Sequence, residues 1–313
     1  FTYLFCLHMP EGKLKMSQEN LPQNRDILFE ERPRATFGFI CLPTDLMADA
    51  ESSAVLSQLE NVRWRLQRLK MDGDTVCAKT YQSAGDHIFA AAETIRPKNS
   101  VDVIGLSCTS LSFTLGQEAV NKKMKQAHPD AKVTNMASSV VEALNFIGGE
   151  NLLVLSPYSD DLAARNIAML QKSGFEVQGN INLGLTTDEQ ISSVSQDTIR
   201  ECVREMVEET LDADTIFIGC SAFATLRPGF IDSLEQEFKK PVVTSMQAML
   251  WNMLRLAEID EPIDNFGSLL YSPKIHEGLG GSNISHIEKR IEKVSFDGII
   301  LSRDQKTETR SVT

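Results

Sequence analysis

The chain has 313 residues, of which 42% are hydrophobic and 24% charged, and its formal net charge is −12 at pH 7. Such a length accommodates two domains of about 150 residues each. The acidic balance argues against a nucleic-acid partner, because phosphate binding requires a basic face. No apolar run approaches the ~18 residues that cross a bilayer, and the six cysteines and five histidines lack metal-ligand spacing. We therefore expect a cytoplasmic protein with reduced cysteines, no metal and no membrane association.

Residues 1–34 are polar and aperiodic except for an apolar start, and we expect them to form a loose arm. The apolar residues 1–7 follow no basic segment and precede no small-residue cleavage site, so they do not resemble a signal peptide. Met16 opens the polar stretch. We therefore expect residues 1–15 to lie outside the working protein.

Residues 35–148 alternate short apolar runs with amphipathic stretches, which is the pattern of strands and helices. The expected strands are Ala35–Cys41, Val101–Leu106 and Ala131–Met136, and the expected helices are Glu51–Leu69, Ser83–Ile95, Leu115–Ala127 and Ser138–Phe146. Strands that alternate with helices form parallel βαβ units with right-handed crossovers. This part of the chain is therefore expected to form one α/β lobe.

Residues 149–272 repeat the alternation after a pair of glycines. The expected strands are Asn151–Ser156, Phe175–Val177, Thr215–Gly219 and Pro241–Thr244, and the expected helices are Asp160–Lys172, Asp188–Leu211, Asp232–Phe238 and Met246–Ala257. We therefore predict an α/β fold of two pseudo-symmetric, doubly wound lobes with parallel sheets and an active site in the cleft between them. The helix near residues 246–257 is able to pack back on the first lobe, and residues 273–313 form a C-terminal tail without an assigned role.

Two cysteines occupy matching places in the two halves, because each closes an apolar, β-branched run. Cys108 follows Val101–Leu106, and Cys220 follows Thr215–Gly219. In parallel α/β folds ligands bind at the carboxyl ends of strands. A thiol at a strand-to-helix turn meets the positive end of the helix dipole, which favours the thiolate. A single cysteine there is more often a small buried hydrophobe, but the repeated pattern favours a functional pair.

Two opposed thiols suit two reactions at a carbon next to a carboxylate. One thiolate can remove a proton while the other thiol donates one from the opposite face, which inverts a stereocentre without a cofactor. Alternatively, one thiolate adds to a double bond, the bond rotates and the thiolate leaves. Both routes develop negative charge on a carboxylate and therefore require oxyanion donors.

The candidate substrate-binding residues follow the ends of expected strands, and they are Pro43, Thr44, Asp45, Thr109, Ser110, Tyr158 and Ser221. Thr109, Ser110 and Ser221 can supply hydroxyl and backbone donors or can cap a helix, and both roles can hold together. A turn that contains proline and aspartate is common for conformational reasons alone. A tyrosine at a strand end can hydrogen-bond a carboxylate, which we favour, or simply pack.

These motifs resemble a known family. Cys108-Thr109-Ser110-Leu111-Ser112-Phe113 resembles the Cys-Thr-Ser-x-Ser-Phe motif of maleate cis-trans isomerases, and arylmalonate decarboxylases share the motif with glycine in place of its cysteine. The segment 156–161 is similar to the group's strand-end tyrosine segment, and the segment 220–226 to its second-cysteine motif. The resemblance spans about Ala35 to Ser272 and implies membership of the aspartate/glutamate racemase superfamily. It further implies two pseudo-symmetric lobes, a site between them and no cofactor.

By the same resemblance, Cys108 and Cys220 match the catalytic cysteine pair. Further matches are the carboxylate-binding positions and the first-strand loop, which correspond to Thr109, Ser110, Tyr158, Pro43 and Thr44. Two positions depart, because Asp45 and Ala222 stand where maleate isomerases usually carry asparagine. A carboxylate there would repel the second carboxylate of a diacid and suit a substrate with an amine. That departure favours a racemase-like member such as the ectoine-utilisation proteins, which also resemble this chain around residues 44–45.

The leading hypothesis is a cofactor-independent isomerase or racemase that acts next to a carboxylate of a small dicarboxylic or amino acid. The motifs favour maleate-type isomerisation, whereas Asp45 favours amino-acid-type racemisation, as in ectoine utilisation. Two further alternatives are an arylmalonate-type decarboxylase that uses Cys220 alone and a non-catalytic protein that binds a small acid between its lobes. The expected partner is a small substrate that bears a carboxylate, and a homo-oligomer is compatible with the sequence.

Overall fold

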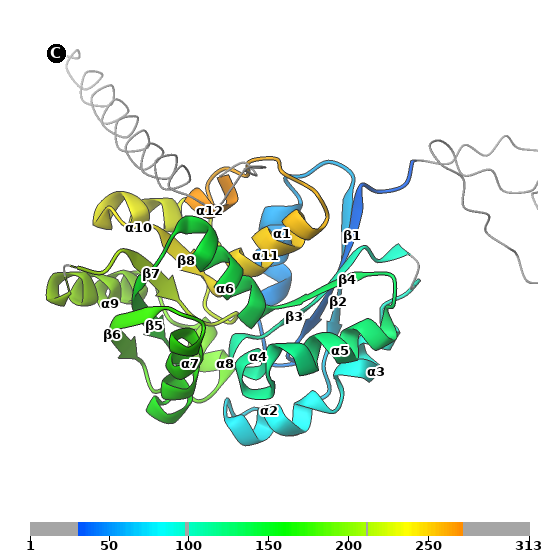
Figure 1. Cartoon of the computed structure of the whole chain (residues 1–313), viewed down its shortest axis with the longest axis horizontal. Coiled ribbons are helices and arrows are strands. Elements are labelled where there is room, and N and C mark those ends of the chain that lie inside the picture. Colours follow the sequence, from blue (N-terminus) through cyan, green and yellow to red (C-terminus); the bar gives the residue numbers. More distant parts are fainter. Residues whose placement is uncertain (1–30, 98–99, 211, 272–313) are drawn as a thin grey trace, which may run out of the picture.

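The chain folds into two α/β lobes, each built on a four-stranded sheet (Figure 1). The structure, a computed structural model, describes residues 31–97, 100–210 and 212–271. The strand orders are β2-β1-β3-β4 and β6-β5-β7-β8, and every pair within these sheets is parallel. The two lobes therefore match strand for strand, which confirms the predicted fold class of two pseudo-symmetric lobes with parallel sheets.

The first lobe contains β1 to β4 and the helices that connect them. Its elements are β1 (Ala35–Cys41), α1 (Ala48–Leu56), β2 (Val62–Arg68), α2 (Ala78–Gly85), α3 (Ile88–Thr94), β3 (Val103–Ser107), α4 (Thr109–Leu115), α5 (Gln117–Ala127), β4 (Lys132–Asn135) and α6 (Met136–Ile147). The strands β1 and β3 are buried along their whole length. They lie in the middle of the sheet with helices on both faces, which is why they read as continuous apolar runs.

The second lobe repeats this order and ends in a short helix. Its elements are β5 (Asn151–Ser156), α7 (Asp160–Lys172), β6 (Glu176–Asn182), α8 (Asp188–Ser192), α9 (Gln196–Glu209), β7 (Thr215–Ile218), α10 (Phe230–Phe238), β8 (Val242–Thr244), α11 (Ser245–Leu256) and α12 (Ser268–Tyr271). The strands β5 and β7 take the places that β1 and β3 hold in the first lobe.

Two helices, α6 and α11, pack against each other where the lobes meet (Figure 1). Helix α6 follows β4 of the first sheet and contacts β8 of the second, whereas α11 follows β8 and contacts β3 and β4. Helix α11 approaches β3 closely, since a Cβ atom on Gly105 would stand 2.5 Å from the Met249 Cε. The exchange of helices therefore ties the two sheets together.

The structure shows that the helix expected over Glu51–Leu69 is wrong in its second half, which forms β2. The apolar residues Val62, Trp64 and Leu66 alternate with polar ones, which is the period of a half-buried strand. Asn61 has a φ of 55°, in the left-handed region, and separates the two elements. β2 lies at the edge of the sheet, where alternating polar side chains reach solvent.

The expected helix Leu115–Ala127 corresponds to α5, apart from Leu115, which ends α4. Two other expected helices are each divided in two, because Ser83–Ile95 covers the end of α2 and α3, and Asp188–Leu211 covers α8 and α9. In the last case both helices have their own cap, because the side chains of Thr187 and Ser195 accept backbone N–H groups.

Most of the expected arm at residues 1–34 and all of the expected tail at residues 273–313 lie outside the described residues. The boundaries 35–148 and 149–272 of the two lobes stay predictions. In the described part of the chain, no helix combines the length and apolar character that crossing a membrane would require.

Candidate active site

The two cysteines lie beyond equivalent strands of the two sheets. Cys108 directly follows β3 and precedes α4, and Cys220 lies two residues after β7. Both residues are buried, with exposed fractions of 3% and 5%. The Cys220 thiol is close enough to raise the pKa of Cys108. The structure therefore brings the two predicted thiols to one site.

Ser245, the first residue of α11, connects the segments that carry the two cysteines. Its Oγ accepts a hydrogen bond of 2.8 Å from the Thr109 hydroxyl and one of 3.0 Å from the Cys220 backbone N–H. All three residues are buried. One hydroxyl thus holds the ends of β3 and β7 in a fixed relation.

Tyr158 and Ser110 form a second link across the same site. The Tyr158 hydroxyl lies within hydrogen-bond reach of both the Cys220 thiol and the Ser110 hydroxyl. Asn166 of α7 donates a 2.8 Å hydrogen bond from Nδ2 to Ser110 Oγ. A second buried tyrosine, Tyr81 of α2, is near enough to both thiols for them to raise its pKa.

The expectation that the turns favour thiolates is wrong for the described state of the protein. Burial is the largest cause that raises the pKa of both cysteine thiols, and the carboxylate of Asp188 raises it further. Hydrogen bonds lower it, from the Leu111 backbone to Cys108 and from the Tyr158 side chain and the Ala222 backbone to Cys220. The donors at the strand ends are therefore present, but desolvation in a closed and acidic site outweighs them.

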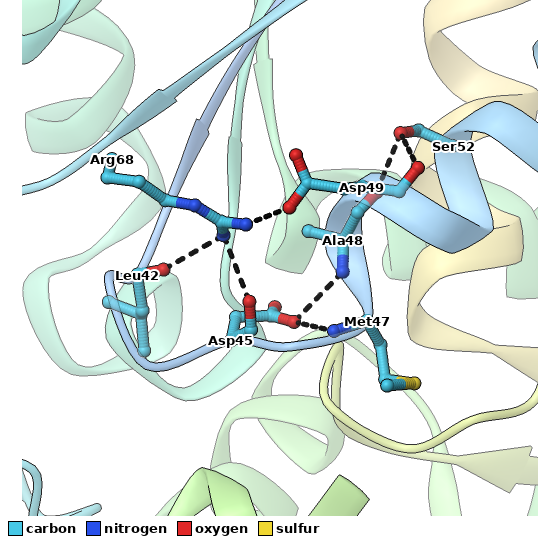
Figure 2. A network of polar contacts seen from close by, with 7 residues as sticks. All are labelled: Leu42, Asp45, Met47, Ala48, Asp49, Ser52 and Arg68. Atoms are coloured by element: carbon cyan, nitrogen blue, oxygen red, sulfur yellow. Dashed lines mark hydrogen bonds and ion pairs between the residues drawn. The ribbon is translucent and has the colours of Figure 1, made fainter.

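Two carboxylates, Asp45 and Asp188, face this site. Figure 2 shows Asp45 in the turn before α1, where its Oδ1 accepts the backbone N–H groups of Met47 at 2.9 Å and Ala48 at 3.0 Å. Burial raises the pKa of Asp45, although the nearby Ser221 hydroxyl and the two N–H groups oppose the shift. Burial likewise raises the pKa of Asp188 to about 6, against the effect of its hydrogen bond with Thr44.

The other predicted residues have different surroundings. Thr44 is half-buried and donates its hydroxyl hydrogen bond to Asp188, whereas the neighbouring Pro43 is exposed. Ser221 is buried beside Cys220. Ala222, which departs from the isomerase pattern, donates its backbone N–H to Cys220 Sγ at 3.3 Å. Apart from Pro43, the predicted candidates therefore gather around the two thiols.

Four residues of the site were not among the predicted candidates, and they are Tyr81, Asn166, Asp188 and Ser245. Tyr81 and Asn166 lie within helices and Asp188 begins one, so their patterns indicate helix positions and not strand ends. β6 ends at Asn182, and the strand expected from the sequence ends earlier, at Val177, so the strand-end rule does not reach Asp188. Ser245 directly follows β8 and could have been found by that rule, which found Cys220.

The fold and the site define a two-lobed α/β protein with one thiol contributed by each lobe. Residues 38–270 match the family model described as arylmalonate decarboxylase. The chain therefore belongs to the arylmalonate decarboxylase family.

Individual relatives include both decarboxylases and isomerases. The chain is 32% identical to an arylmalonate decarboxylase from Bordetella bronchiseptica over 164 residues, which cover 51% of this chain and 67% of that protein. It is 25% identical to a maleate isomerase from Pseudomonas putida over 177 residues, which cover 54% and 70% respectively.

A solved structure shares the fold over nearly its full length. It is that of a maleate cis-trans isomerase mutant from Nocardia farcinica with a covalently bound succinylcysteine intermediate. The TM-score is 0.69 at 18% identity, and the match covers 77% of this chain and 99% of that one.

Proposed function

We propose that this protein is a cofactor-independent isomerase or racemase that acts next to a carboxylate of a small acid, with Cys108 and Cys220 as its reacting groups. The observation that carries the proposal is the placement of two buried thiols after equivalent strands, joined through the Ser245 hydroxyl. The relatives of this chain include both isomerases and decarboxylases. A second cysteine at position 108 favours the isomerase side.

Two routes use this pair. In racemisation, one thiolate takes the proton of the carbon next to the carboxylate, and the opposite thiol returns a proton to the other face. The enzyme then holds the same number of protons, with the thiol and thiolate exchanged. In cis-trans isomerisation, a thiolate adds to one alkene carbon, the remaining single bond rotates, and the thiolate leaves with its electron pair.

The negative charge that develops on the substrate carboxylate requires donors. The first backbone N–H groups of α4, at Thr109 and Ser110, have no helical carbonyl to bond, and they adjoin Cys108. The Tyr158 hydroxyl faces the same site from the second lobe. The succinylcysteine of the Nocardia farcinica isomerase mutant supports the addition route for that relative.

The first test removes each thiol in turn. Cys108→Ser and Cys220→Ser should each lower kcat at least about a thousandfold, because neither hydroxyl replaces a thiolate at neutral pH. The measurement is proton NMR in D₂O with maleate, aspartate and glutamate enantiomers and substituted malonates. Cys41→Ser is the matched control, since Cys41 is an equally buried thiol at the end of β1. Full activity in either active-site variant would contradict the two-thiol mechanism.

A decarboxylase of substituted malonates is the second candidate, favoured by the family model and by the 32% identical relative. It would use Cys220 alone, as the thiol that protonates the carbon after CO₂ leaves. The same NMR experiment separates the candidates, because a decarboxylase would retain its activity as Cys108→Gly and lose it as Cys220→Ser. An isomerase or racemase would lose its activity in both variants.

A further inference from the structure

One buried oxygen of Asp45 lacks a partner. Figure 2 shows that Asp45 Oδ1 accepts the backbone N–H groups of Met47 and Ala48, which explains that oxygen as part of the turn that leads into α1. The second oxygen, Oδ2, is buried and accepts no hydrogen bond of good geometry within the described residues, and only 1% of the residue is exposed. A nearby donor is the Ser221 hydroxyl, which is close enough to lower the pKa of Asp45. Buried carboxylate oxygens are costly to leave unpaired. This one therefore indicates a group that is bound only during function.

Asp188 reaches the same place from the other lobe. It is the first residue of α8, and its carboxylate accepts the Thr44 hydroxyl from the loop after β1. The Asp45 carboxylate raises the pKa of Asp188, and both carboxylates raise the pKa of Cys108 and Cys220. The two carboxylates and the two thiols therefore lie close enough to act on one another, and the Thr44 hydrogen bond places Asp188 beside the loop that carries Asp45.

The charged groups with the largest effects on the pKa of Asp188 and of both thiols are acidic. Arg68 lowers the pKa of Asp45, but Figure 2 shows its guanidinium bound to the Asp49 carboxylate and to the backbone carbonyls of Leu42 and Asp45. Its charge is therefore compensated outside the site. A cation supplied by a ligand would balance Asp45 and Asp188.

We infer that Asp45 and Asp188 together bind the protonated amine of the substrate, so that the substrate is an amino acid and not a simple diacid or an arylmalonate. The inference rests on the proposed function for the identity of the reacting carbon. It assigns Asp188 as a specificity-determining residue. One lobe supplies each carboxylate, so an amine at this point would also hold the two lobes together.

An ammonium group at this point has a chemical consequence for the thiols. A nearby positive charge favours the thiolate, whereas burial and the two carboxylates disfavour it. The substrate would therefore help to form the nucleophile or base that acts on it. A diacid would instead add negative charge to a site that already holds two carboxylates.

The test compares acids that differ only in the amine. Aspartate with succinate, glutamate with glutarate and 2-phenylglycine with phenylacetate form matched pairs, each amino acid being tested as both enantiomers. Binding is measured by calorimetry on the intact protein, and turnover by NMR in D₂O. We expect at least one amine member to bind tighter than its partner by about tenfold to a hundredfold, as for a charge-assisted hydrogen bond.

The variant Asp188→Asn should remove most of that preference while keeping the side-chain shape and the oxygen that accepts the Thr44 hydrogen bond. Glu189→Gln removes the same charge from the next, exposed position and should keep the preference. If Asp188→Asn fails to fold, the matched pairs on the unsubstituted protein still decide the matter.

The outcomes separate this inference from the proposed function. Equal binding within every pair overturns the inference, even if maleate is converted to fumarate in a cysteine-dependent reaction, which would uphold the function. A preference for amines that Asp188→Asn abolishes supports the inference, even without turnover, which would count against the function. A preference that survives in Asp188→Asn overturns the assignment of Asp188.

Discussion

Ser245 receives two buried hydrogen bonds, one from the segment of each cysteine. In Ser245→Ala the Thr109 hydroxyl and the Cys220 N–H lose their acceptor, which costs ~1–3 kcal/mol for each buried group. We expect kcat to fall about tenfold to a hundredfold if a comparable penalty appears in the transition state. The measurement is kcat against KM once a substrate is in hand.

Ser139→Ala is the control, because Ser139 is a buried serine whose hydroxyl contacts Thr134 and Asn252 away from the thiols. It should lower the melting temperature and leave kcat unchanged. Equal losses of kcat in both variants would show that Ser245 serves general stability and does not position the reacting groups.

For individual residues, the sequence predicts which side chains lie at the site better than it predicts their burial and pKa. The strand-end rule found Cys108, Cys220 and Tyr158, because a strand end is a local pattern. It could not show that the thiols have a raised pKa, since that depends on the carboxylate of Asp188 and on burial by both lobes. Tyr81 was missed for the same reason, because its place at the site arises from the packing of α2.

At the scale of elements, the alternation of strands and helices was predictable wherever the strands are central and fully apolar. The edge strand β2 was mistaken for helix because Val62 and Leu66 fit a helical period as well as an alternating one, and only Trp64 distinguishes the two. Helix α8 was merged with α9 because the caps at Thr187 and Ser195 act over a few residues. Edge strands and short helices depend on tertiary contacts more than on their own pattern.

Glu51 joins helix α1 to the segment that follows Cys220. Its Oε1 accepts the Leu226 backbone N–H at 2.7 Å, and burial raises its pKa to about 8. The side chain is therefore mostly neutral at pH 7, and Glu51→Gln should keep the hydrogen bond, the stability and the activity. Glu51→Ala should cost ~1–3 kcal/mol and reduce kcat, because a buried N–H loses its acceptor.

Urea unfolding and steady-state kinetics of the two variants at pH 7 provide the measurement. Losses in Glu51→Gln as large as those in Glu51→Ala would mean that the negative charge is needed, which contradicts a neutral side chain. In that case Glu51 would act on the site electrostatically through Asp45, which is its charged neighbour.

At the scale of the whole molecule, the two lobes are joined on several sides of the thiols. Besides the contacts of Ser245 and Glu51, an isolated bridge pairs Thr75 with Thr187, and Val76 N–H donates to the Thr186 carbonyl at 2.8 Å. The Thr187 side of this bridge adjoins Asp188. None of these links follows from a local pattern, since each joins residues that are far apart in the sequence. The closed and acidic character of the site is therefore a property of the assembled lobes.

The stability of the whole molecule should depend on pH through the buried carboxyl of Glu235. Glu235 is buried where α10, β8 and α12 meet, and it accepts hydrogen bonds from Val242 N–H at 3.1 Å and from Ser268 N–H and hydroxyl at 2.9 and 2.7 Å. Burial nevertheless raises its pKa from 4.5 to about 7. A carboxyl with a raised pKa binds its proton more tightly in the folded chain. Its contribution to stability is complete below the unfolded pKa and is lost as the pH rises through the folded one.

Glu235 should therefore lower the free energy of unfolding by ~3 kcal/mol between about pH 4.5 and pH 7. Glu237 and Glu261 act in the opposite direction, since hydrogen bonds from arginines lower their pKa, but they do so only at more acidic pH.

Urea unfolding between about pH 5 and pH 8 measures the decline in stability. Asp188 and Glu51, with pKa values raised to about 6 and about 8, add to it, so the contribution of Glu235 is the difference between the unsubstituted protein and Glu235→Gln. Glu235→Gln should reduce the decline by ~3 kcal/mol, whereas Glu189→Gln, which removes an exposed charge, should leave it unchanged. Identical pH profiles for Glu235→Gln and the unsubstituted protein would show that Glu235 stays ionised in the folded chain, with its three hydrogen bonds outweighing the cost of burial.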